Sequence, residues 1–91
     1  MKHVYLVNRM SLHISADIFV NNERIAHTSF KKAKQVFDAF LNESGATNVV
    51  FEDNLTYIDK KNTFVTYTNK NGRSERMYIE KCELNKYNNF I

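Results

Sequence analysis

One segment of the chain, residues 28–45, has the spacing of apolar residues that an amphipathic helix requires. Its sequence is TSFKKAKQVFDAFLNESG. Apolar residues recur at intervals of three and four, which places them along one side of a helix: Phe30, Ala33, Val36, Phe37, Phe40 and Leu41. Thr28 or Ser29 is suited to cap the start of this helix, and Gly45 is suited to end it in a left-handed conformation. A helix with one apolar stripe must bury that stripe against another element, which is most simply a β-sheet.

The segments before the helix alternate between apolar and polar residues, as strands do. Residues 3–10 predict a first strand, and residues 14–20 predict a second one. The pair Asn21–Asn22 tolerates the backbone angles of a tight hairpin. It therefore predicts a turn, after which residues 23–27 return as a short third strand with Ile25 as its main core residue.

The segments after the helix predict a meander. Residues 48–58 contain two short apolar runs, which we interpret as one strand with a bulge or break at Asp53–Asn54. The next strands are rich in β-branched and aromatic residues, and they cover residues 63–68 and 74–84. Polar residues at 59–62 and 69–72 predict the two connecting turns.

These segments together predict a single α+β domain over residues 1–91. In it, an antiparallel β-sheet of about five to six strands, in the order β-β-β-α-β-β-β, packs on one amphipathic helix. A chain of 91 residues with 43% hydrophobic residues can bury one modest core without disulfides. Residues 85–91 are expected either to fray or to dock on the core through Tyr87 and Phe90.

The sequence contains no signal for a membrane or for secretion. No apolar run approaches the roughly 18 residues that a membrane span needs. The first ten residues, MKHVYLVNRM, lack the apolar core and the cleavage site of a signal peptide. We therefore expect a cytoplasmic protein without membrane association, in which the lone Cys82 is a small buried residue of a strand.

Catalytic and metal-binding patterns are absent from the sequence. His3, His13 and His27 have irregular spacing and no cysteine nearby, unlike a zinc site. Two glycines are too few for a phosphate-binding loop. Glu52 and Asp53 are adjacent, so on a strand they point to opposite faces and do not form a carboxylate pair. We therefore expect no catalytic residue, no metal site and no cofactor, and we do not expect an enzyme.

Basic residues form the one chemical pattern that indicates a binding partner. Lys31, Lys32 and Lys34 lie at the start of the helix, where backbone N–H groups and the helix dipole attract anions. Five more lie in or beside the later turns: Lys60, Lys61, Lys70, Arg73 and Arg76. Acidic residues are interleaved with them, so the same eight residues also fit an ordinary solvated surface. They are the candidate binding residues for a partner or an anion.

The short, motif-free, Asn- and Lys-rich chain is similar in general character to small accessory proteins of phages and mobile elements in low-GC bacteria. Many such proteins bind and block a host protein. The leading hypothesis is therefore a non-catalytic protein-binding module that inhibits a host protein, for example one that processes nucleic acid or acts in defence. The alternative is a protein that binds nucleic acid directly through the basic helix start and turns. An unprotected sheet edge also makes the sequence compatible with a homodimer, and two copies could hold a small anion between them.

Overall fold

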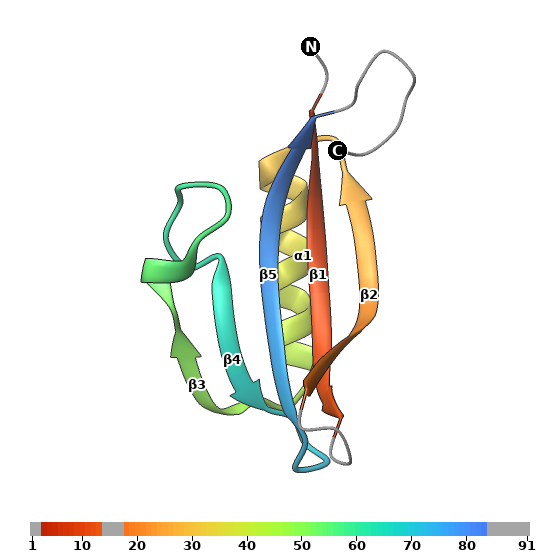
Figure 1. Cartoon of the computed structure of the whole chain (residues 1–91), viewed down its shortest axis with the longest axis vertical. Helices are drawn as coiled ribbons and strands as arrows, with labels where there is room; N and C mark the ends of the chain where they lie inside the picture. Colours follow the sequence, from red (N-terminus) through yellow and green to blue (C-terminus); the bar gives the residue numbers. More distant parts are fainter. Residues whose placement is uncertain (1–2, 14–17, 84–91) are drawn as a thin grey trace.

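A computed structural model describes residues 3–13 and 18–83 of the chain (Figure 1). The predicted tail at 85–91, with Tyr87 and Phe90, lies outside these residues. In chain order the elements are β1 (His3–His13), β2 (Ile18–His27), α1 (Phe30–Glu43), β3 (Thr47–Phe51), the short 3-10 helix η1 (Asp53–Leu55), β4 (Phe64–Thr68) and β5 (Ser74–Glu83).

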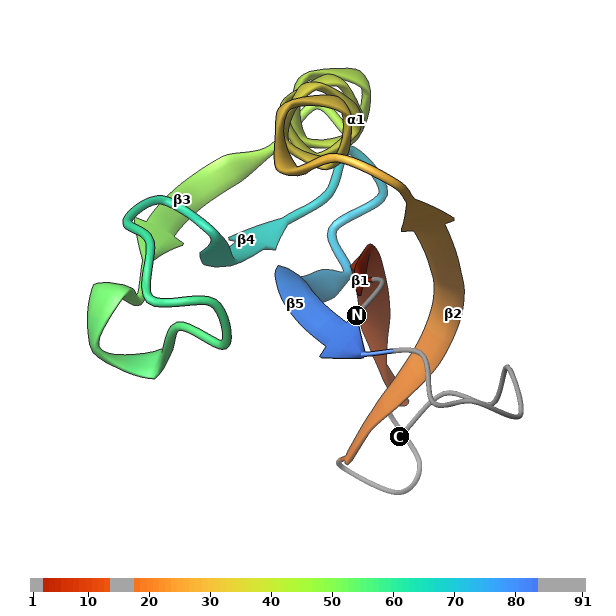
Figure 2. The same cartoon turned by 90° about the horizontal axis from the view of Figure 1, so that it is seen from above.

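The strands form one antiparallel sheet of five strands in the order β2-β1-β5-β4-β3. The first and last strands of the chain pair at its centre, from His3 opposite Glu83 to Ser11 opposite Glu75. The helix connects the two end strands, β2 and β3, and lies against one face of the sheet (Figure 2). The predicted α+β fold, an antiparallel sheet packed on a single helix, is confirmed, with two strands before the helix and a three-stranded meander after it.

The predicted turn at Asn21–Asn22 is wrong, because both residues lie within β2. Residues 23–27 are therefore the second half of β2 and not a third strand. Arg9 pairs with Glu23 and Met10 with Asn21, so Asn22 is an extra residue that forms a β-bulge. An end strand has only one neighbour, and it can absorb an extra residue without breaking a second ladder. The connection between β1 and β2 falls in residues 14–17, outside the described residues.

The second predicted strand segment, within residues 54–58, is also wrong. The chain leaves the sheet after Phe51 and enters η1. The side-chain carboxylate of Asp53 accepts a hydrogen bond from the backbone N–H of Asn62 at 2.8 Å, which folds the chain back on itself. The backbone of Tyr57 pairs with the sheet through an isolated parallel bridge to Glu80. The later strands and both turns lie where the sequence predicts them.

The helix holds the core together through the stripe that the sequence predicts. It begins at the Ser29 cap, whose hydroxyl accepts a hydrogen bond from the N–H of Lys32 at 3.2 Å. Ala33 and Phe37 are fully buried on its inner side. They pack against residues of the three middle strands: Val7, Val65, Tyr67, Met77 and Ile79. Within residues 3–13 and 18–83, no helix has the length and apolar character needed to cross a membrane.

The helix covers the sheet unevenly. It lies closest to β1, β5 and β2, and every residue of β3 is exposed to solvent. Val50 is 50% exposed and Phe51 is 38% exposed. On the opposite end strand Ile25 is 38% exposed, so the prediction that it is a main core residue is wrong. Both end strands have one open side, where their apolar residues cannot be fully enclosed.

The face of the sheet without the helix also carries buried side chains. Leu6, Phe64 and Cys82 are all nearly inaccessible there. The burial of Cys82 that the sequence predicts is thus confirmed. The rings of Phe64 and Tyr78 stack with centroids 5.5 Å apart. Tyr57 extends this stack, with its ring 4.8 Å from that of Tyr78.

The end of the helix is fixed to the β4–β5 turn. Gly45 has φ +63°, as the sequence predicts for a left-handed helix end. The N–H of Lys70 donates to the carbonyl of Ser44 at 2.8 Å. A Cβ placed on Gly45 would lie 3.0 Å from the Cβ of Lys70, whereas Gly72, at φ +81°, has open space around it. Gly45 is therefore required for both its backbone angle and its lack of a side chain.

Gly45→Ala should lower the free energy of unfolding more than Gly72→Ala does. The left-handed backbone angle alone costs about 1–2 kcal/mol for alanine, and both variants incur that cost. The contact with Lys70 should add about 1–3 kcal/mol at Gly45 only. Urea denaturation of the two variants and the wild type measures the difference. Equal losses would show that the helix end does not press on the β4–β5 turn.

Candidate functional site

Five of the eight predicted basic residues lie together at one end of the molecule. The ammonium of Lys34 donates to the backbone carbonyl of Asn62 at 3.0 Å. The Lys60 ammonium lies 5.1 Å from the centre of the Phe30 ring. These two contacts join the helix start to the loop before β4. We call the resulting group the lysine end: Lys31, Lys32, Lys34, Lys60 and Lys61.

The loop between β3 and β4, residues 52–63, projects beside this group (Figure 1). We call it the β3–β4 lobe. Its shape is fixed internally, because Asp53 binds the N–H of Asn62 and the Thr63 hydroxyl donates to the carbonyl of Lys60 at 2.7 Å. Asp59 and Asn62 have φ of +56° and +60°, angles that Asp and Asn tolerate better than most residues. The backbone of the lobe is therefore held in one shape by its own residues.

Two apolar side chains of the lobe face solvent. Leu55 is 50% exposed and Tyr57 is 58% exposed. One side of the Tyr57 ring rests on Phe64 and Tyr78 at centroid distances of 5.9 and 4.8 Å. The ring is thus immobilised by stacking while much of it remains accessible. An aromatic side chain held in this way can contact a partner with little loss of conformational freedom.

The charges at this end are mixed. The Lys34 ammonium forms an ion pair with Asp38 at 2.7 Å, which offsets part of the field of the lysine end. The lobe itself contains three acidic residues, Glu52, Asp53 and Asp59. The surface therefore presents both signs of charge next to exposed apolar groups, and it lacks the one-sided positive field of most nucleic-acid-binding surfaces.

The other three predicted basic residues lie elsewhere. Lys70 and Arg73 belong to the β4–β5 turn, at the opposite end of the sheet from the lobe (Figure 1). Arg76 lies on the face without the helix, with its guanidinium 5.6 Å from the centre of the Phe64 ring. The eight candidates are thus divided among three places, and only the lysine end joins residues that are distant in sequence.

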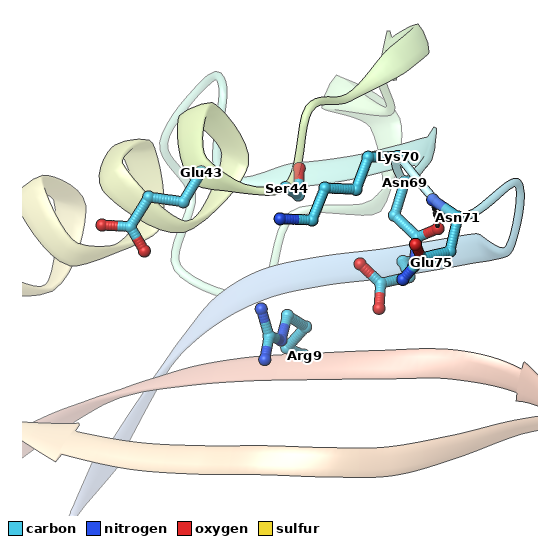
Figure 3. Close-up of a pocket in the computed structure, with 7 residues that line it drawn as sticks. All are labelled: Arg9, Glu43, Ser44, Asn69, Lys70, Asn71 and Glu75. Atoms are coloured by element: carbon cyan, nitrogen blue, oxygen red, sulfur yellow. Dashed lines mark hydrogen bonds between the residues drawn. The ribbon is translucent and has the colours of Figure 1, made fainter.

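A polar pocket of about 320 Å³ lies where the helix ends (Figure 3). Its walls carry two cationic side chains, Arg9 and Lys70, and two acidic ones, Glu43 and Glu75. Glu75 is only 7% exposed, and one of its oxygens accepts a hydrogen bond from the Ser11 hydroxyl at 3.0 Å. With balanced charges, the pocket does not attract ions of one sign.

The floor of the pocket continues into a partly buried polar cluster. The Arg9 guanidinium forms an ion pair with Glu23 and lies 5.2 Å from the centre of the Phe40 ring. Burial raises the pKa of the Tyr67 hydroxyl well above its ordinary value, and the neighbouring carboxylate of Glu75 raises it further. Tyr67 is therefore a neutral group at physiological pH. The cluster thus links the helix, through Phe40, to residues of β1, β2, β4 and β5.

The candidate site predicted from the sequence did not include the most accessible apolar groups of the lobe. Leu55 and Tyr57 follow the loss of alternation at Asp53–Asn54, and this loss was the available signal that the chain leaves the sheet there. Sequence reasoning also missed the pairing of Lys34 with Asp38, although a spacing of four residues on a helix favours that pair. The candidate surface therefore combines predicted lysines with apolar residues that sequence alone did not indicate.

Neither a metal-binding cluster nor a known relative points to a different site. In the part of the chain that the structure describes, no group of three or more His, Cys, Asp and Glu side chains is placed to hold a metal ion. No protein-family model, curated protein or solved structure matches this chain.

The raised pKa of Tyr67 predicts a loss of stability in alkali. The unfolded chain loses this proton near pH 10, whereas the folded protein keeps it, so the contribution of Tyr67 is complete below pH 10 and falls above it. At about pH 11 the wild type should lose about 1.4 kcal/mol more than Tyr67→Phe does. Urea denaturation near neutral pH and at pH 11 measures this difference.

Tyr67→Phe differs from the wild type only by this hydroxyl, so the comparison isolates Tyr67. Tyr57→Phe removes an exposed hydroxyl instead, and it should leave the alkaline loss as large as in the wild type. If Tyr67→Phe loses as much stability in alkali as the wild type, the hydroxyl is not in the buried, carboxylate-facing environment described above.

Proposed function

We propose that this protein is a non-catalytic protein-binding module whose contact surface is the β3–β4 lobe together with the lysine end. One observation carries the proposal: a lobe held by its own hydrogen bonds exposes Leu55 and Tyr57 beside a group of lysines. Protein interfaces commonly centre on rigid aromatic and aliphatic anchors surrounded by a polar rim.

The mixed charge of this surface supports a protein partner over other classes of partner. A complementary protein surface would offer an apolar depression for Tyr57 and Leu55, with acidic groups placed to meet Lys31, Lys32 and Lys61. Lys31, Lys32 and Lys61 are exposed, so their ammonium groups are available for such contacts. Charges at the rim of an interface mainly set the association rate and the choice of partner.

The partner that we propose is a host protein, and the module acts by masking it. Inhibition by masking needs a fixed contact surface and does not need a reactive group. The β3–β4 lobe together with the lysine end supplies such a surface. The similarity in size and composition to accessory proteins of phages and mobile elements favours a cytoplasmic host target that processes nucleic acid or acts in defence. That similarity is an analogy and supports only the class of target.

Affinity capture from a low-GC bacterial lysate tests the proposal when it compares matched variants. The wild-type protein should retain a partner in stoichiometric amount. Leu55→Asp and Lys61→Glu should lose it, because each places a negative charge on the contact surface. Arg73→Glu makes the same charge reversal at the opposite end of the sheet, and it should retain the partner. The activity of the captured protein is then measured with and without the module.

Three outcomes would contradict this function. The first is that no stoichiometric partner is retained by the wild type. The second is that Lys61→Glu and Arg73→Glu behave alike, which would show that the lobe is not the contact surface. The third is a captured enzyme whose activity is unchanged by the module, which would leave binding in place but remove inhibition.

Direct binding of nucleic acid is the second candidate function. The observation in its favour is that Lys34 and Lys60 bring two sequence-distant basic groups together near the helix start. Backbone N–H groups at that helix start could assist in contacting phosphate. Against it stand the Asp38 ion pair and the acidic residues of the lobe, which weaken the positive field.

Fluorescence anisotropy with labelled duplex and single-stranded oligonucleotides distinguishes this candidate. True binding should weaken steeply with salt, with a slope of log K against log salt of about −0.9 for each phosphate contact on duplex DNA. The combined variant Lys31→Glu, Lys32→Glu and Lys34→Glu should abolish it, whereas Arg73→Glu should not. Absent or salt-insensitive binding would exclude this function.

A further inference from the structure

We infer that the outer edge of β3 binds the same edge of a second copy of this chain, around a two-fold axis at Val50. The strand has the sequence TNVVF, without a charged residue or a proline that would block pairing. It is an end strand of the sheet, and its apolar residues Val49, Val50 and Phe51 are all exposed. Exposed apolar edges of this kind pair readily with another strand.

The hydrogen-bonding groups on this edge are fixed by the pairing on its inner side. The N–H of Glu52 donates to the carbonyl of Phe64 in β4 at 2.8 Å. Backbone groups of successive residues point to opposite sides of a strand, so the N–H and carbonyl of Phe51 point outward. Val50 is paired with Thr66 on the inner side, and the carbonyl of Val49 therefore points outward as well.

Two-fold antiparallel pairing can be centred on Val49, Val50 or Phe51. Only the Val50 register places every apolar residue opposite another one, with Val50 facing itself and Val49 facing Phe51. In this register the acidic Glu52, which follows the strand end, lies opposite the neutral Asn48 of the second copy. A register centred on Phe51 would instead place Glu52 opposite Val50. The strand is thus self-complementary in one register.

A groove beside the edge of β3 provides a place for the Phe51 side chain of the second copy. The groove has a volume of about 610 Å³ and lies between the helix and β3, with Leu41, Ala46 and Val49 as its apolar walls. Phe51 pairs with Val65 and therefore shares the helix side of the sheet. In the Val50 register, Phe51 of the second copy lies opposite Val49 and next to this groove. Each copy would thus insert one phenyl ring beside the helix of the other.

This contact does not depend on the proposed function, since it uses β3 and the groove and leaves Leu55, Tyr57 and the lysine end free. Sedimentation velocity over a range of concentrations tests it directly. The wild type should form dimers as the concentration rises, and Val50→Lys should remain monomeric. Ile25→Lys is the matched control, because Ile25 is an exposed apolar residue on the other end strand. It should dimerise like the wild type.

Disulfide formation tests the register without relying on a disruptive variant. Directly opposed residues that do not share hydrogen bonds have Cα atoms about 4.5 Å apart, within the range of a disulfide. Val50→Cys should therefore form a covalent dimer in mild oxidant. Val49→Cys is the matched control on the same strand. Its two copies would lie diagonally, at about 7–8 Å, too far apart for efficient closure.

The wild-type protein, whose only thiol is the buried Cys82, gives the background for oxidation. The inference is overturned if the wild type sediments as a monomer at every concentration, or if Ile25→Lys prevents dimers and Val50→Lys does not. It is also overturned if Val49→Cys cross-links as efficiently as Val50→Cys. If Val50→Lys fails to fold, the cross-linking comparison still decides, because cysteine and valine are similar in size.

Discussion

The fold depends on the burial of one helical stripe against a sheet that is wider than the helix. A helix with its side chains is about 10–12 Å across, and neighbouring strands lie about 4.8 Å apart. Five strands therefore place the two end strands about 19 Å from each other. The helix lies closest to β1, β5 and β2, with Phe37 fully buried beneath it. The end strand β3 remains open to solvent along its length.

This mismatch in width explains where the candidate surfaces lie. Residues over the centre of the sheet are enclosed and serve stability, as the fully buried Met77 and Ile79 do. Residues beyond the reach of the helix, such as Phe51 and Leu55, keep their apolar groups accessible. The described part of the chain thus presents apolar contacts at the border of the sheet. Both the lobe and the open strand follow from having a single helix on five strands.

Local patterns in the sequence were sufficient to predict the helix, its Gly45 end, the antiparallel α+β architecture and the last two strands. These features depend on residues close together in the chain, whose spacing is visible in the sequence. The Asn21–Asn22 turn was wrong because two asparagines fit a bulge as well as a turn. The register with β1, which decides between them, is a long-range property.

The site was less predictable for the same reason. The sequence identified the lysines, but the contact that joins Lys34 to Asn62 links residues 28 positions apart. The burial of Glu75 beside Ser11 depends on the pairing of β1 with β5, across 64 positions. The exposure of Phe51 depends on where the helix ends relative to the sheet. No local sequence pattern indicates these long-range contacts.

The uneven cover of the sheet also divides the molecule by local stability. Strands with many enclosed side chains open only when the whole domain unfolds, whereas elements with few buried contacts open separately at lower cost. The strands β1 and β5 lie beneath the helix. We therefore expect them to open only when the whole domain unfolds. The fully exposed β3 has few buried contacts, and we expect it to open separately at lower cost. Its backbone amides are therefore the least protected of the sheet, and a partner that binds this edge would slow their exchange with solvent.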